Sequence, residues 1–97
     1  MAFVQIIDFR TSQPDEMIKV ADEWEKATEG KRKTGRRVVG RDRNDPGRHF
    51  IVVFFDSYED AMENSSLPET DAFSKKMMSF AEGPPTFYDL DIVDDRD

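Results

Sequence analysis

The sequence has no cysteine and a single histidine, His49. The missing thiols exclude disulfide bonds, thiolate metal sites and a cysteine nucleophile, and their absence fits a reducing compartment. One imidazole cannot build a zinc or copper site of the usual kind, and no arrangement of carboxylates in the sequence identifies a metal site. We therefore expect no metal and no cofactor.

Long apolar runs and phosphate-binding motifs are also missing. No hydrophobic stretch approaches the length of a membrane-spanning helix, and the apolar residues 2–7 are too few for a signal peptide. The chain has neither a glycine-rich phosphate loop nor a nucleophile elbow. Its net charge of −7 argues against general binding to nucleic acids or anionic membranes. We expect a cytoplasmic protein with no nucleic-acid or membrane partner.

The hydrophobic pattern predicts one domain, residues 1–97, in β-α-β-β-α-β order. Ser12 and Ser57 are the expected helix caps, and Gly30 ends the first helix. Proline disfavours helix at the preceding residue, so Leu67-Pro68 interrupts the second helix. The expected strands cover residues 2–9, 36–43, 49–55 and 86–93.

The third strand is apolar on both faces, and the first strand nearly so. In the third strand Phe50, Val52 and Phe54 alternate with Ile51, Val53 and Phe55. Strands apolar on both faces belong in the middle of a sheet. This predicts an α+β, ferredoxin-like antiparallel sheet of order 4-1-3-2. Two helices cover only one face of such a sheet, and a second copy of the chain is the simplest cover for the other.

Charge is distributed unevenly, which favours a particular pairing of two copies. Residues 31–48 hold eight basic side chains, whereas the last strand is acidic. Opposite charges on the two edge strands would select one register between sheets that meet face to face. A basic solvated hairpin beside an acidic tail is the alternative interpretation. The sequence does not decide which sheet face meets the helices. The residues we assign to the interface are Ile51, Val53, Phe55, Arg41, Asp89 and Asp91.

A ligand pocket is expected between the helices and the sheet. Trp24 of the first helix, with Phe73 and Met77 of the second, would form apolar walls for a small apolar or aromatic ligand; ordinary core packing is the alternative. Asn64 lies just before the helix break, where an amide can orient a polar group or satisfy the local backbone. His49 is a candidate proton carrier, or else a solvated or inter-chain contact.

The element order, the sheet apolar on both faces and the segment Glu63-Asn64-Ser65-Ser66-Leu67-Pro68-Glu69-Thr70-Asp71-Ala72-Phe73 resemble the dimeric α+β barrel superfamily, specifically its antibiotic biosynthesis monooxygenase-like group. The resemblance implies a homodimer with one cavity per subunit. It also implies oxidation of quinol-type aromatic substrates by molecular oxygen without metal or flavin. Asn64 matches a family asparagine on the second helix and is the candidate catalytic residue. The tryptophan that often follows it is missing, as is the histidine that haem-degrading relatives carry on this helix.

Three functions remain open at this point. The first is a cofactor-independent monooxygenase acting on an aromatic or quinol-type substrate, and the second is a non-catalytic ligand-binding or scaffold protein of the same fold. The third is an RNA-recognition module, whose aromatic strand motif is partly matched by Arg48, Phe50 and Phe55; His49 and Val52 depart from it. The sequence decides neither the substrate nor any assembly beyond a dimer.

Overall fold

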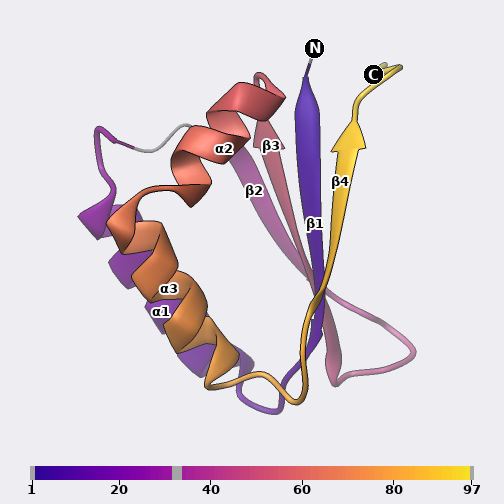
Figure 1. Ribbon diagram of the computed structural model, residues 1–97. Helices are drawn as coiled ribbons and strands as arrows, with labels where there is room; N and C mark the ends of the chain where they lie inside the picture. The colour runs from indigo at the N-terminus through magenta and orange to yellow at the C-terminus, as the bar shows by residue number, and fades with distance from the viewer. Residues whose placement is uncertain (1, 32–33, 97) are drawn as a thin grey trace.

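The computed structural model describes residues 2–31 and 34–96. It confirms the β-α-β-β-α-β order, with the second helix in two pieces (Figure 1). No helix in the described part of the chain has the length and apolar composition to cross a bilayer. The elements are β1 (Phe3–Arg10), α1 (Pro14–Ala27), β2 (Thr34–Arg41), β3 (Arg48–Phe55), α2 (Tyr58–Ser65), α3 (Pro68–Met78) and β4 (Thr86–Asp91).

The four strands form one antiparallel sheet in the order β2-β3-β1-β4, which confirms the ferredoxin-like prediction. β1 and β3 are central, as their two apolar faces predicted, and β2 and β4 are the edges. The register places Val39, Ile51, Ile7 and Phe87 in one row across the sheet. This row points toward the helices and forms the floor of the space beneath them.

The two predicted helix caps have different outcomes. Ser57 caps α2 as expected, because its hydroxyl oxygen accepts the backbone N–H of Asp60 at 3.1 Å. The prediction for Ser12 is wrong, since Gln13 occupies the cap position of α1 and makes no side-chain cap bond. The hydroxyl of buried Thr11 instead accepts the N–H of Gln13 at 3.0 Å. A neighbouring threonine therefore orders this turn in place of the serine.

The helix interruption is confirmed, and it changes the direction of the chain. Leu67 has an extended backbone, with φ −65° and ψ 134°, and Pro68 opens α3 directly after it. In Figure 1, α2 lies across the top of the sheet, whereas α3 runs beside α1. The break thus separates α2, near β2 and β3, from the α1–α3 pair that stands farther from the sheet.

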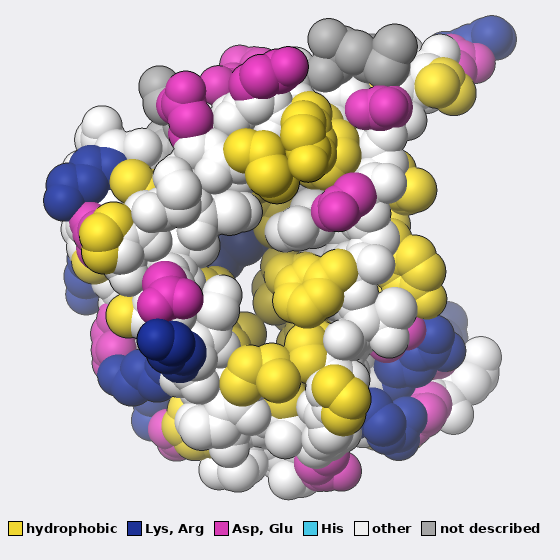
Figure 2. Space-filling view, viewed as in Figure 1, with side chains coloured by type: hydrophobic (Ala, Val, Ile, Leu, Met, Phe, Trp, Pro, Cys, Tyr) yellow, Lys and Arg dark blue, Asp and Glu magenta, His cyan; other side chains and the backbone are white. Residues whose placement is uncertain are grey.

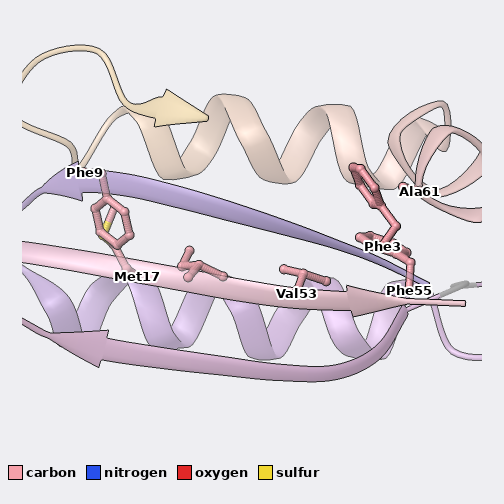
Figure 3. Close-up of a cluster of buried hydrophobic side chains, with 7 residues drawn as sticks. Phe3, Phe9, Met17, Val53, Phe55 and Ala61 are labelled. Atoms are coloured by element: carbon pink, nitrogen blue, oxygen red, sulfur yellow. The ribbon is translucent and has the colours of Figure 1, made fainter. Parts of the chain in front are cut away.

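The core lies between the sheet and the helices and includes three residues that we had assigned to a dimer interface. Ile51, Val53 and Phe55 are at most 9% exposed and pack with Met17 of α1 and Ala61 of α2 (Figure 3). They cannot meet a second copy, because the helices already cover them. The face left for such a contact carries the alternate residues of β3.

Among the described residues, no helix covers the opposite face of the sheet (Figure 1). Its apolar side chains include Val38 and Tyr88, which are 39% and 46% exposed. The accessible surface of 6668 Å² exceeds the roughly 5,700 Å² expected for a folded monomer of 11.2 kDa. We call this surface the open face; its apolar side chains are Val4, Ile6, Val38, Phe50, Val52, Phe54, Tyr88 and Leu90.

An ion pair across β1 and β3 predicts a specific pH dependence of stability. Arg48 Nη2 donates to Asp8 Oδ2 at 2.8 Å, and this hydrogen bond lowers the pKa of Asp8 below its ordinary value of 3.8. The stabilisation is present above the unfolded-state pKa and is lost as the pH falls through the folded-state pKa. Asp8→Asn should therefore lower the urea midpoint at pH 7, and the difference from the parent protein should shrink below pH 3.8 and vanish only once the pH is below the lowered folded-state pKa of Asp8.

Asp95→Asn, in the exposed C-terminal segment, is the control and should unfold like the parent at both pH values. An Asp8→Asn deficit that persists unchanged in strong acid would contradict the role given to this ion pair.

Candidate functional site

The space between the helices and the sheet is only partly filled. A hollow of about 190 Å³, here called the Asn64 hollow, lies beneath the helix break. Figure 2 shows the molecule hollowed between its two layers, with hydrophobic side chains around the opening. The walls of the Asn64 hollow include Gln5 and Phe87 from the sheet, Arg37 from β2, Trp24 from α1, Asn64 from α2, and Thr70 and Phe73 from α3.

Asn64 is the most unusual polar group in this hollow. It is the second-last residue of α2 and only 6% exposed. Its side-chain oxygen Oδ1 has no hydrogen-bond partner among the described residues. A buried polar atom without a partner costs about 1–3 kcal/mol, so such atoms are rare unless a ligand or water completes them. Asn64 lines the hollow, so its unpaired amide oxygen is the acceptor that a ligand or water bound there would be expected to complete.

Aromatic rings form the wall opposite the sheet. Trp24 and Phe73 lie with ring centroids 5.3 Å apart and planes tilted by 33°. The indole Nε1 of Trp24 donates to the hydroxyl of Thr70 at 3.0 Å, which orients the ring. Since Thr70 belongs to the first turn of α3, the helix break also positions this aromatic wall. A planar apolar ligand fits such a surface.

A second hollow of about 360 Å³, here called the His49 hollow, adjoins the first at Arg37 and Ile51. His49 is 5% exposed and stacks on Phe9 with ring centroids 5.6 Å apart. Its Nδ1 lies 3.3 Å from the carbonyl oxygen of Gly47, which can only accept a hydrogen bond. We therefore assign the proton of the neutral ring to Nδ1, which leaves the lone pair on Nε2.

The residues that we predicted for the pocket fall into two adjoining groups. Trp24, Asn64 and Phe73 line the Asn64 hollow together. His49 and Met77 line the His49 hollow instead. The space beneath the helices therefore consists of two adjoining hollows and not of the single pocket that the sequence predicted.

Among the edge residues assigned to the dimer contact, Arg41 lines the His49 hollow. Asp89 accepts a hydrogen bond from Gln5 Nε2 at 3.1 Å. Asp91 is an exposed residue at the end of β4. All three lie on edge strands, as predicted, but the register places them on the face of the sheet that meets the helices and not on the open face.

Sequence reasoning missed Arg37, which lines both hollows. Its guanidinium carbon lies 5.9 Å from the Trp24 ring centroid, a cation–π arrangement. The alternation of β2 contained a signal for this residue. Arg41 pairs with His49 across the turn, and four residues further back along β2 Arg37 pairs with Val53. The side chains of Arg37 and Val53 therefore lie on the same face of the sheet. No group of three or more histidine and carboxylate side chains within residues 2–31 and 34–96 is arranged to hold a metal ion.

Several solved structures are similar to this chain in fold. SnoaB, a cofactor-independent oxygenase from Streptomyces nogalater solved as an asparagine-to-alanine variant, superposes with a TM-score of 0.82 at 8% identity, over 97% of this chain and 95% of that one. A Caulobacter crescentus protein assigned to the antibiotic biosynthesis monooxygenases gives 0.81 at 14% identity, over 96% and 91%. A Chloroflexus aurantiacus protein with the same assignment gives 0.76 at 19% identity, over 100% and 98%.

The chain has the fold of the antibiotic biosynthesis monooxygenase-like proteins. The resemblance seen in the sequence is thereby confirmed at the level of the fold. Neither a protein-family model nor a curated protein matches the sequence. At these identities the monooxygenase fold alone is shared, so activity has to be argued from the residues of the site.

Proposed function

We propose that this protein is a homodimeric, cofactor-independent monooxygenase that oxidises a quinol-type aromatic substrate in the Asn64 hollow. The observation that carries the proposal is the unpaired, buried Oδ1 of Asn64 between aromatic walls. A hydroxyl group on an aromatic ring supplies the donor that this oxygen lacks. The fold shared with SnoaB, an oxygenase that needs no cofactor, supports the same assignment.

The proposed chemistry requires little from the protein beyond positioning and a dry site. An anthrone-type ring carries a CH₂ group opposite its carbonyl group. Loss of a proton gives an anion that reduces O₂ directly; one oxygen atom ends in a new carbonyl group and the other leaves as water with the two hydrogens. Asn64 orients the ring hydroxyl, and the rings of Trp24 and Phe73 pack on its face. Exclusion of water protects the anion until oxygen reacts.

The homodimer is part of the proposal, and the open face supports it. Each large apolar side chain left in water forgoes roughly 1.5–3 kcal/mol of burial. A second sheet packed on the open face would bury these side chains and hold β1 and β3 firmly beneath the hollow.

A non-catalytic ligand-binding protein is the second candidate. It is favoured by the absence of a tryptophan after Asn64, where Ser65 and Ser66 stand. Such a protein would hold the same aromatic ligand in the same hollow without consuming oxygen.

Oxygen consumption distinguishes the two candidates. Purified protein in an oxygen electrode with 1,8-dihydroxyanthrone and a metal chelator should consume O₂ faster than the spontaneous reaction. One anthraquinone should form for each O₂ consumed. Heat-denatured protein is the control for autoxidation. Saturable binding of the anthrone with no acceleration over this control would overturn the oxygenase and establish the binding protein.

A further inference from the structure

Arg37 occupies a position that the proposed oxidation does not explain. It lies on β2 opposite Val53, so its side chain shares the face that meets the helices. It is half-buried and lines both the Asn64 hollow and the His49 hollow. Trp24 supports the guanidinium from one side, at 5.9 Å from the ring centroid. The charge is thus held at the wall of the cavity.

Within the described residues, Arg37 makes no ion pair and no side-chain hydrogen bond, unlike Arg10 and Arg48. Arg10 donates to Asp45 at 2.7 Å, and Arg48 donates to Asp8 at 2.8 Å. A guanidinium carries five N–H donors, and a half-buried one normally finds a carboxylate or carbonyl. The donors of Arg37 therefore remain available to a ligand.

Of the polar residues that line the Asn64 hollow, Asn64 and Arg37 require different groups on that ligand. Asn64 Oδ1 accepts hydrogen bonds, so it requires a donor from the ligand. Arg37 only donates and carries a positive charge, so it requires an anionic acceptor. Phenolic hydroxyls, with a pKa near 10, remain neutral at pH 7, whereas carboxylates are ionised.

We propose that the ligand is a hydroxylated aromatic carboxylic acid, whose carboxylate binds Arg37 while a ring hydroxyl donates to Asn64. The inference rests on the proposed function for the choice of an aromatic ring, and it adds the acidic group. A cavity of about 150 Å³ holds benzene, so the Asn64 hollow, at about 190 Å³, accommodates one ring. The adjoining His49 hollow leaves room for further rings or substituents. Arg37 then acts as a specificity-determining residue.

Two matched probes separate charge recognition from oxidation. 2,5-Dihydroxybenzoate and its neutral amide, 2,5-dihydroxybenzamide, differ only in the group offered to Arg37. Their dissociation constants can be measured anaerobically from the fluorescence of Trp24, the only tryptophan, and by calorimetry. The parent protein should bind the acid at least about tenfold more tightly than the amide, as expected for a hydrogen-bonded charge pair.

Variants at Arg37 identify the group responsible. Arg37→Gln should bring the two dissociation constants within about twofold of each other. Arg37→Lys should keep part of the preference for the acid, because lysine retains the positive charge but lacks the planar guanidinium that donates two parallel hydrogen bonds to a carboxylate. Arg36→Gln is the matched control: it removes an equal charge from an exposed neighbour that lines neither hollow, and should keep the full preference.

Equal binding of the two probes by the parent, no binding of either at millimolar concentration, or a preference that survives Arg37→Gln would overturn the proposal. Since binding is measured without oxygen, a protein that prefers the acid but oxidises no anthrone would contradict the oxygenase and leave the role of Arg37 supported.

Discussion

Replacing Val52 with glutamate is expected to convert the proposed homodimer into a monomer. Val52 lies in the middle of the open face, paired with Ile6 on one side and Val38 on the other. A dimer closed over this face would bury the new carboxylate against apolar side chains with no cation beside it. Burying an unpaired charge costs several kcal/mol, and every 1.4 kcal/mol raises the dimer dissociation constant about tenfold. Sedimentation velocity at micromolar protein measures the change.

Val93→Glu is the control for Val52→Glu. Val93 is 88% exposed beyond the end of β4, so the same substitution there should leave the dimer intact. A parent protein that sediments as a monomer, or a Val52→Glu variant that remains a dimer, would contradict the assignment of the open face.

Replacing Asn64 with alanine is expected to slow turnover by about 100-fold, the loss that follows when a substrate is misplaced by about 1 Å. The free energy of unfolding should change much less than for most buried substitutions. The reason is that the lost oxygen Oδ1 makes no hydrogen bond in the described structure, so its burial destabilises the protein. Oxygen-electrode rates and urea unfolding of the same preparations give the two quantities.

Asn64→Leu sharpens this test, because it refills the volume with apolar atoms. We expect stability equal to or above that of the parent, together with the same loss of turnover. Glu59→Ala, on the exposed side of α2, should leave turnover unchanged. A variant at Asn64 that keeps the parental rate would remove this residue from the site.

The sheet was predictable from the sequence because a period of two is visible within single strands. The apolar run Phe50–Phe55 placed β3 in the centre, and the structure agrees. The same run could not show which face meets the helices, since both faces are equally apolar. The face that meets the helices is set by where α1 and α2 pack. Their packing places Ile51 in the core rather than at an interface.

The candidate site was predictable where a local signal existed. Pro68 marked the helix break and so identified Asn64 at the end of α2. Arg37 was missed because its place in the cavity depends on which face of β2 meets the helices, and the sequence does not decide that face. The bond between Trp24 and Thr70 joins residues far apart in the chain, and no local pattern announces it.

A crystal structure of the complex with a hydroxylated aromatic ligand, prepared anaerobically with 2,5-dihydroxybenzoate, tests the central claim most directly. The quantity to measure is the distance from the ligand hydroxyl oxygen to Oδ1 of Asn64. We predict a hydrogen bond of about 2.7–2.8 Å, with the ring against Trp24 and Phe73. A ligand bound elsewhere on the protein, or an Asn64 oxygen bonded to a protein donor while the Asn64 hollow stays empty, would contradict the account.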